Sequence, residues 1–545
     1  MSLDPPGGGC RPTAGIAAPP APRPGCTPGL DRVAALARRL PPLVAAGPGA
    51  ATITARAPFT GVALAEVPVS TPADVDRVVR RAREAQPVWA ARQAEDRAAV
   101  LLRVHDLVLQ RQSEAMDLVQ AEAGKARLHA YEEVVDVAIA ARFSARRGPG
   151  IIADRRHPGL VPGLTRVTEV HHPRGVVGIV APWNYPLALV ASDALPALLA
   201  GNAVVLRPDP LTTLTAAWVV EVLVEAGVPE ELVALVTGDG PVTGAALVDA
   251  ADYVCFTGST ATGRRVAEQA ARRLVGTSLE LGGKNSLYVA EDADLDRAAE
   301  AAVRDCFTSA GQLCVAAERL VLHERVADEF LRRFLDRVGR LRMGVALDFS
   351  VDLGCLVSSA HLDRVSRHVT DAVERGAVVL AGGRARPDLG PLFFEPTVLD
   401  RVPATAACHH EETFGPVVTV HRVSSDAEAV AIANDTEYGL TATVWTRDRR
   451  RGEVLARRLR CGTVNINESY IAAWGSAAAP MGGRKASGLG RRHGVEGLLR
   501  FTESQTIAVQ RGPGLGWLYG QGGRRMSAAL STALRATRRT HLPWP

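Results

Sequence analysis

Two glycine-containing motifs carry a carboxylate and a thiol that could together perform acyl chemistry. Residues 280–284 read Glu-Leu-Gly-Gly-Lys, and residues 311–314 read Gly-Gln-Leu-Cys. A cysteine thiolate attacks carbonyl carbons well, and a carboxylate can activate the water that hydrolyses the resulting thioester. We therefore predict that Cys314 is the nucleophile and Glu280 the general base. Taken alone, Cys314 could be a buried thiol without a catalytic role, and Glu280 could be a surface carboxylate at a strand end.

An asparagine lies upstream in the segment 181–186, which reads Ala-Pro-Trp-Asn-Tyr-Pro. The side-chain amide of Asn184 could hold an oxyanion together with the backbone N–H of Cys314. An asparagine shortly before a proline also occurs in plain turns. A cation or a helix terminus near Cys314 would lower the pKa of the thiol and favour the nucleophilic thiolate.

A further motif, Phe-Thr-Gly-Ser-Thr-Ala-Thr-Gly at residues 256–263, follows an apolar segment and opens a helical one. The N–H groups at a helix start can bind a phosphate oxygen, which makes Gly258 and Ser259 candidates for holding a dinucleotide. The motif differs from the Gly-x-Gly-x-x-Gly dinucleotide fingerprint, so by itself it indicates little.

Taken in order, these motifs and the segment Glu-Glu-Thr-Phe-Gly-Pro at residues 411–416 resemble the NAD(P)-dependent aldehyde dehydrogenase superfamily, from about residue 50 to about residue 510. The resemblance implies that an aldehyde is oxidised to its carboxylic acid through a thiohemiacetal and a thioester on Cys314. It also implies that Glu412 and Phe414 hold the nicotinamide ribose and flank the ring. Three further residues belong to the cofactor site by resemblance: Trp183, Asn184 and Leu281.

The segment Arg-Pro-Asp-Pro at residues 207–210 departs from the superfamily's Lys-Pro-x-Glu, whose lysine and glutamate bind the adenosine ribose. By resemblance, Arg207, Pro208, Asp209 and Pro210 are the corresponding cofactor residues. Pro210 has no carboxylate to repel a 2′-phosphate, and a guanidinium can pair with one. We therefore expect NADP as the preferred cofactor and NAD as the alternative. Arg207 is the weaker indication, because only three of the 63 basic residues are lysines.

Two segments bear on the substrate: Val-Asn-Ile-Asn-Glu at residues 464–468 and Ala-Ala-Trp-Gly-Ser at residues 472–476. Both resemble actinobacterial NADP-dependent succinate-semialdehyde dehydrogenases. Characterised enzymes of that activity carry carboxylate-binding arginines where this chain has Ser192 and Thr308. A buried carboxylate without a cation is costly. The resemblance makes succinate semialdehyde the leading substrate. The missing arginines make a different, more apolar aldehyde the alternative.

Five apolar segments alternate with helical ones in the middle of the chain, at residues 176–181, 203–206, 232–236, 253–256 and 278–281. Such strands predict a parallel sheet covered on both faces, with ligands at the carboxyl ends of the strands. The predicted fold class is α/β, an aldehyde dehydrogenase-like fold with a Rossmann-type cofactor domain and an α/β catalytic domain. The resemblance adds a β arm, residues 164–172 and 501–509, that pairs with a neighbouring subunit of a homodimer or homotetramer.

We divide the chain into five parts: a disordered arm (1–30), a cofactor domain (31–282, with an arm strand inserted at about 160–174), a catalytic domain (283–480), a return segment with the oligomerisation strand (481–511) and a basic tail (512–545). In the tail, Met526, Leu530, Ala533 and Leu534 recur at helical spacing among arginines. A short amphipathic helix there could pack on the enzyme's own surface or be weakly attracted to an anionic membrane, and disorder is the third possibility.

The composition is that of an ordinary soluble globular enzyme, since 47% of the 545 residues are hydrophobic and 22% are charged. A net charge of +5 gives no nucleic-acid footprint, and no apolar run reaches the length of a membrane helix. The N-terminus shows no secretory signal, so we expect a cytoplasmic enzyme. Eight cysteines without Cys-x-x-Cys spacing and adjacent histidine pairs (171–172, 409–410) indicate neither disulfides nor a metal site.

Two other functional classes are alternatives to an active dehydrogenase. A non-enzymatic, structural member of the superfamily would be indicated by the loss of Cys314 or Glu280, and both are present. A CoA-dependent acylating enzyme is the alternative among active members, but such relatives usually lack a water-activating glutamate at the position of Glu280.

Overall fold

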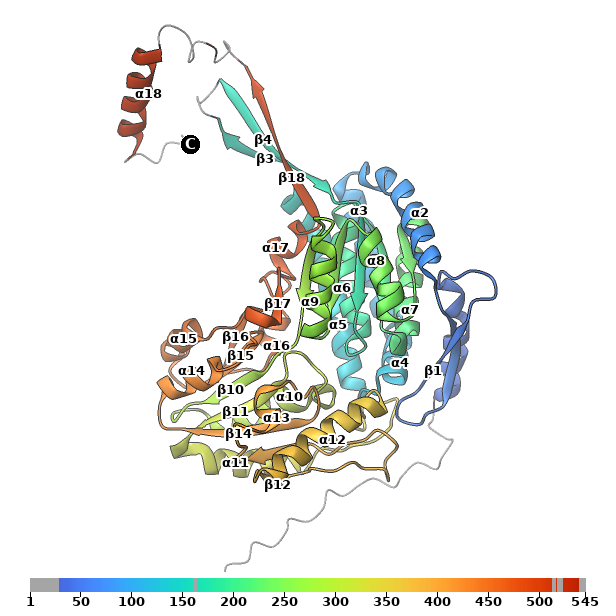
Figure 1. Cartoon of the computed structure of the whole chain (residues 1–545), viewed down its shortest axis with the longest axis vertical. Coiled ribbons are helices and arrows are strands. Elements are labelled where there is room, and N and C mark those ends of the chain that lie inside the picture. Colours follow the sequence, from blue (N-terminus) through green and yellow to red (C-terminus); the bar gives the residue numbers. More distant parts are fainter. Residues whose placement is uncertain (1–28, 160–163, 512–515, 517–522, 539–545) are drawn as a thin grey trace, which may run out of the picture.

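The computed structural model describes residues 29–159, 164–511, 516 and 523–538 (Figure 1). The fold is mixed α/β, as the sequence predicts, with two large sheets in the body and a slender sheet that extends from it. The predicted disordered arm lies outside the described residues, apart from Gly29 and Leu30. No helix among the described residues combines the length and the apolar character that a membrane crossing requires.

The first large sheet has the strand order β17-β9-β8-β5-β6-β7, and all neighbours are parallel except β17 and β9. Its strands are β5 (Val176–Ala181), β6 (Ala203–Pro208), β7 (Val233–Leu235), β8 (Tyr253–Thr257), β9 (Gly276–Glu280) and β17 (Gly488–Leu489). The five predicted strands all form. Every residue of β5 is buried, which explains its unbroken apolar run. The strand order reverses at β5, the kind of point where open α/β sheets bind ligands.

Helices flank this sheet, and a further helical layer lies outside them (Figure 1). The flanking elements are α2 (Pro72–Ala90), η2 (Pro210–Thr212), α6 (Pro186–Leu199), α7 (Thr213–Glu225), η3 (Glu230–Leu232), η4 (Gly240–Gly244), α8 (Ala245–Ala250) and α9 (Thr260–Ala271). The N-terminal elements are α1 (Leu30–Arg39), η1 (Pro41–Leu43), β1 (Thr52–Arg56), β2 (Ala63–Pro68), α3 (Ala94–Gln110), α4 (Gln112–Ala123) and α5 (Arg127–Ile152). The long helix α5 packs against α3 and α6.

The second large sheet has the order β12-β13-β14-β11-β10-β15-β16, and it is parallel except at its edge strand β12. Its strands are β10 (Asn285–Val289), β11 (Ala317–His323), β12 (Val378–Ala381), β13 (Thr397–Asp400), β14 (Val417–Val423), β15 (Thr441–Trp445) and β16 (Thr463–Ile466). The helices of this region are α10 (Leu295–Phe307), η5 (Thr308–Gly311), α11 (Glu324–Val338), α12 (Ser359–Glu374), α13 (Ala407–His410), α14 (Asp426–Asn434), α15 (Arg449–Arg458), α16 (Ile471–Trp474) and η6 (Lys485–Ser487). Helix α17 (Gly494–Leu499) packs instead against α5 and α6.

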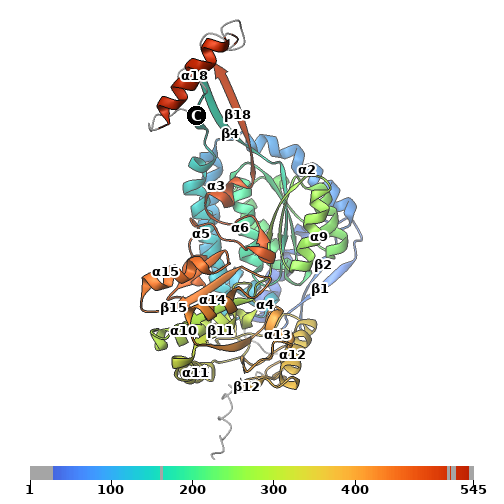
Figure 2. The same ribbon diagram turned by 60° about the vertical axis from the view of Figure 1, so that its left-hand side comes forward.

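The slender sheet is the predicted arm, seen from two sides in Figures 1 and 2. Its strands β4 (Thr165–Pro173) and β18 (Thr502–Gln510) pair antiparallel along their whole lengths, although they are far apart in the sequence. A third strand, β3 (Arg155–Pro158), pairs with β4 and was not predicted. Nearly all of β18 is exposed, including Ile507 and Val509.

The predicted tail helix is α18 (Gly523–Thr537), which lies beyond the arm (Figure 1). It has no buried residue. The single chain therefore does not show the packing on its own surface that was one of the three expectations for this segment.

Candidate active site

One cavity of about 240 Å³ lies at the carboxyl ends of β5, β8 and β9, where loops of the second sheet meet them. It brings together the three predicted catalytic residues and most of the predicted cofactor residues. The predicted residues on its wall are Trp183, Asn184, Gly258, Ser259, Glu280, Leu281, Cys314, Glu412 and Phe414. The segment 207–210 lies outside the cavity, at the end of the neighbouring strand β6.

Cys314 is held by a tightly packed turn after η5. Gly311 has φ +70°, and a Cβ atom there would lie 2.1 Å from the carbonyl oxygen of Gly415, so only glycine fits. The side-chain amide of Asn285 donates to the carbonyl oxygens of Cys314 (2.7 Å) and Ala316 (2.8 Å). These contacts fix the backbone on both sides of the sulfur.

The thiol of Cys314 is protonated at neutral pH. Burial, aided by the carboxylates of Glu280 and Glu412, raises its pKa to about 12. Arg492 acts to lower this pKa, but burial outweighs its effect. The nucleophile therefore needs a base in the same cavity to take its proton.

Glu280 has the properties of that base. It ends β9, its Oε1 atom is buried without a hydrogen-bond partner among the described residues, and burial raises its pKa to about 7. The guanidinium groups of Arg492 and Arg500 oppose this rise. About half of the Glu280 carboxyl groups are thus ionised at neutral pH, which suits a group that must accept and release a proton.

A buried ion network supplies those two guanidinium charges. Arg492 contacts Asp193 through Nε (3.0 Å) and Nη2 (2.7 Å), and its Nη2 also donates to the Thr257 hydroxyl on the cavity wall (3.0 Å). Arg500 forms a second ion pair with Asp193. The sequence did not indicate this network, because Asp193 and Arg492 are 299 residues apart and arginines occur throughout the chain.

Asn184 lies just before α6, is 4% exposed, and donates through Nδ2 to the carbonyl oxygen of Gln312 (3.2 Å). This bond orients the amide beside the Cys314 turn. A primary amide carries a second N–H, which can donate a hydrogen bond to an oxyanion on the cavity side.

The loop 411–416 is fastened to the Glu-Leu-Gly-Gly-Lys turn. The N–H of Gly283 donates to Oε1 of Glu412 (2.8 Å), and a Cβ atom on Gly282 would lie 2.4 Å from the other oxygen of that carboxylate. Burial raises the pKa of Glu412 to about 8. Lys284 forms a buried ion pair with Glu318 (2.5 Å), whose carboxylate also accepts the Phe414 N–H (2.8 Å).

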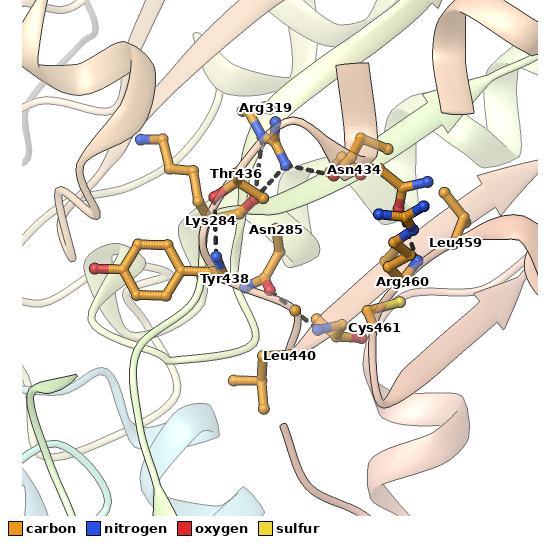
Figure 3. Close-up of a pocket in the computed structure, with 15 residues that line it drawn as sticks. Lys284, Asn285, Arg319, Asn434, Thr436, Tyr438, Leu440, Leu459, Arg460 and Cys461 are labelled. Carbon is orange, nitrogen blue, oxygen red and sulfur yellow. Dashed lines mark hydrogen bonds between the residues drawn. The ribbon is translucent and has the colours of Figure 1, made fainter. Parts of the chain in front are cut away.

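A second small cavity lies behind this turn (Figure 3). Arg319 donates through Nε to the carbonyl oxygen of Lys284 (3.0 Å) and through Nη1 to that of Ile432 (2.8 Å). The cavity holds about 10 Å³, room for no more than about one water molecule. Its residues therefore support the Lys284 turn rather than bind a ligand.

Helix α12 adds two residues to the main cavity that the sequence did not single out. His361 packs edge-on against Trp183 at 5.4 Å between ring centroids and hydrogen-bonds the carbonyl oxygen of Phe414 (2.6 Å). Arg364 donates to the carbonyl oxygen of Glu412 (2.5 Å). The two residues are three positions apart, which places both on one face of the helix. This spacing is the only feature of the sequence that could have indicated their shared role.

The fit of a dinucleotide can be judged from the groups near its phosphates. The start of α9, with Gly258 and Ser259, opens into the cavity, and backbone N–H groups there suit a pyrophosphate. The buried guanidinium of Arg207 donates to the Gly238 carbonyl oxygen, while its Nε has no partner among the described residues. Asp209 accepts the Leu211 N–H (3.0 Å) and so begins η2. The start of α9 and the Arg207 guanidinium fit a phosphorylated dinucleotide, whereas the Asp209 carboxylate serves to cap η2.

Comparisons with known proteins agree with this geometry. A protein of Mycobacterium ulcerans (strain Agy99), provisionally named succinate-semialdehyde dehydrogenase (NADP(+)) 2, is 53% identical over 453 residues, which cover 83% of this chain and 88% of that protein. A glutarate-semialdehyde dehydrogenase of Pseudomonas putida is 37% identical over 463 residues, 84% of this chain and 94% of that protein.

Among solved structures, betaine aldehyde dehydrogenase from Staphylococcus aureus in complex with NAD+ matches with a TM-score of 0.85 at 30% identity, covering 89% of this chain and 98% of that one. The sequence pattern of one family, described as the aldehyde dehydrogenase family, matches residues 45–507. The chain therefore belongs to the aldehyde dehydrogenase family.

Proposed function

We propose that the chain oxidises succinate semialdehyde to succinate with NADP, through a thioester on Cys314. One observation carries the reaction class: Cys314, Glu280 and Asn184 line a single cavity that also includes the start of α9. A nucleophile, a base with a pKa of about 7, an amide donor and a phosphate-binding helix start are the parts that this reaction needs.

The residues act in two stages. In the first, Glu280 takes the proton of the Cys314 thiol as the sulfur attacks the aldehyde carbon, and Asn184 and the Cys314 N–H hold the oxygen of the thiohemiacetal. The nicotinamide, when bound, supplies the two-electron acceptor that turns the thiohemiacetal into a thioester. Glu280 passes the thiol proton to solvent before the second stage. In that stage Glu280 takes a proton from water, the hydroxide adds to the thioester carbon, and the C–S bond breaks to give the acid and the Cys314 thiolate, which regains the proton from Glu280.

Two observations support NADP over NAD. Pro210 offers no side-chain carboxylate at the end of β6, and the Nε of Arg207 lacks a partner among the described residues. The name of the Mycobacterium ulcerans relative also specifies NADP.

The substrate proposal rests on the relatives and meets one difficulty in the structure. Ser192 donates to Asp136 (2.7 Å) and Thr308 donates to the carbonyl oxygen of Arg304 (2.8 Å), so neither position supplies a cation. The alternative remains a more apolar aldehyde. The glutarate-semialdehyde relative adds a longer carboxylated aldehyde to the set to be compared.

The exposed strand β18 supports a homodimer or homotetramer in which the arm pairs with a neighbouring subunit, and we place the enzyme in the cytoplasm. Light scattering of the purified chain, with and without residues 502–510, tests the assembly. Cell fractionation tests the location.

A panel of aldehydes tests the function. Succinate semialdehyde, glutarate semialdehyde, butanal and benzaldehyde are each offered with NADP and with NAD, and reduced nicotinamide is followed by absorbance. The proposal expects the highest kcat/KM for succinate semialdehyde with NADP. A higher kcat/KM for butanal or benzaldehyde would establish the apolar alternative, and oxidation of none of the four would overturn the function.

A further inference from the structure

Cys314 contacts two groups of residues, and only one of them lines the cofactor cavity. On its other side it packs against a buried cluster that includes Tyr185, Leu313, Val315 and Tyr470. None of these four lines the cofactor cavity. Because a bound dinucleotide would fill the cavity, we take this cluster, which we call the apolar approach, as the side from which an aldehyde would reach the sulfur. Partly exposed apolar side chains packed against it are Leu189, Ile471, Trp474 and Met481.

The apolar approach ends at a single carboxylate on α5. The Tyr470 hydroxyl donates to Oε2 of Glu132 (3.1 Å), and the Tyr185 hydroxyl also acts to lower the pKa of this carboxyl group. The Tyr185 hydroxyl is 3.1 Å from the hydroxyl of Ser309. Glu132 is partly exposed, whereas the two tyrosines are buried. A substrate lying along the approach therefore meets Glu132 at its far end.

Lys125, the cation whose charge lowers the pKa of Glu132, is already paired. Lys125 contacts Oε1 of Glu133 at 2.5 Å and sits 3.2 Å above the Tyr185 ring. The other Glu133 oxygen accepts the N–H groups of Leu187 (2.9 Å) and Ala188 (3.0 Å). Lys125 and Glu133 cancel, so the charge at the end of the approach is set by Glu132 alone.

Two further titratable groups lie around the site. Burial lowers the pKa of His129 to about 3, so its ring is neutral, and the Ser309 N–H donates to it. Asp305 accepts the backbone N–H of Tyr470 and the Thr443 hydroxyl, and burial raises its pKa to about 7, so its titration would persist in a variant that lacks the Glu132 carboxyl group.

We propose that Glu132 selects the substrate by charge: in its protonated form it donates a hydrogen bond to the distal carboxylate of an anionic aldehyde, and in its ionised form it repels that carboxylate. The inference rests on the proposed oxidation at Cys314. It explains how a carboxylated aldehyde can bind where no free cation faces it, because a carboxylic acid and two tyrosine hydroxyls can satisfy a carboxylate by hydrogen bonds.

The proposal gives a pH dependence with a definite sign. Burial raises the pKa of Glu132 to about 7, against the opposing charge of Lys125 and the Tyr470 hydrogen bond. Glu132 is thus protonated below about pH 7 and ionised above it. The substrate's own carboxyl group, with an ordinary pKa of about 4.3, is ionised throughout this range. Binding of the anionic aldehyde should weaken as pH rises through 7, while that of a neutral aldehyde should not.

The test is the ratio of kcat/KM for succinate semialdehyde to that for butanal, measured with NADP from pH 6 to 8.5. Titration of Glu280 affects both substrates and cancels in the ratio. The ratio should fall with pH, by up to about tenfold per unit above pH 7. In Glu132→Gln it should be flat. The matched control is Glu468→Gln, which removes a partly exposed glutamate paired with Arg304 (3.1 Å) two residues before Tyr470, and it should behave as the wild type.

A second variant keeps the test decisive if Glu132→Gln does not fold. Tyr470→Phe removes a hydrogen bond that favours the ionised form of Glu132, so the midpoint of the fall should move to higher pH. A ratio independent of pH in the wild type, a fall that persists in Glu132→Gln, or an unmoved midpoint in Tyr470→Phe would overturn the proposal. Failure of the proposed function looks different, since neither aldehyde would then be oxidised.

Discussion

Replacing Arg492 with methionine should shift the pH dependence of thioester hydrolysis. Asp193 carries one negative charge between the two guanidinium groups of Arg492 and Arg500, so the network has a net charge of about +1 beside Glu280. Arg492 is the largest of the charges that lower the pKa of Glu280. In Arg492→Met, Asp193 and Arg500 neutralise each other, and Glu280 keeps only the smaller effect of Arg491.

The size of the effect follows from the pKa of Glu280, about 7. A nearby cation lowers a carboxyl pKa by about 1–3 units, and taking the lower value moves Glu280 to about 8 in the variant. At pH 7 the ionised fraction then falls from about one half to about one tenth, a roughly fivefold loss of the base. At pH 9 Glu280 is about nine-tenths ionised or more in both the wild type and the variant, so their rates converge. Asp193 keeps one partner, so the variant should lose only about 1–3 kcal/mol of stability.

The assay is the pH profile of steady-state turnover under conditions where hydrolysis limits the rate, shown by a burst of reduced cofactor. Arg492→Lys, which keeps the charge, should restore most of the wild-type profile. The control is Arg304→Met, which removes a half-exposed arginine paired with Glu300 and Glu468. A rate loss of equal size at every pH in Arg492→Met would refute the reasoning, because it would indicate a structural fault rather than a shifted pKa.

The remaining predictions concern the nucleophile, the base, the cofactor and the tail. Cys314→Ala should abolish aldehyde oxidation while calorimetry still detects cofactor binding, and turnover within about tenfold of the wild type would exclude this nucleophile. Glu280→Gln should leave a burst of reduced cofactor but slow the steady state, and an unchanged steady state would remove Glu280 from its role. Pro210→Glu should shift the ratio of kcat/KM toward NAD, whereas a wild type that already strongly prefers NAD would contradict our interpretation of the 207–210 segment. Removing residues 520–545 should preserve turnover, and any binding to anionic vesicles that the intact chain shows should vanish at high salt.

The elements that position the site could be predicted from the sequence because their signals are local. The unbroken apolar run of β5 and the alternation of strands with helices define a parallel sheet, and both strands of the arm were expected within a residue or two. The turns around Glu280 and Cys314 carry glycines where another residue would collide, such as Gly311 against Gly415. Short sequence motifs therefore reveal where these turns require glycine.

What the sequence could not show depends on contacts between distant segments. Burial in a cavity that two sheets build together raises the pKa of Cys314, and this effect outweighs the lowering by Arg492. Arg492 and Arg500 act on Glu280 through Asp193 on α6, and nothing distinguishes them in a chain with so many arginines. His361 reaches the cavity only because α12 packs beside the loop of Phe414.

The central claim is that Cys314 carries an acyl group that Glu280 releases. The most direct measurement is the intact mass of Glu280→Gln after mixing with NADP and succinate semialdehyde, followed by peptide mapping. We predict a mass increase of one succinyl group, located on Cys314 and absent from the double variant Glu280→Gln, Cys314→Ala. Steady turnover of Glu280→Gln with no adduct, or an adduct on another residue, would contradict the account.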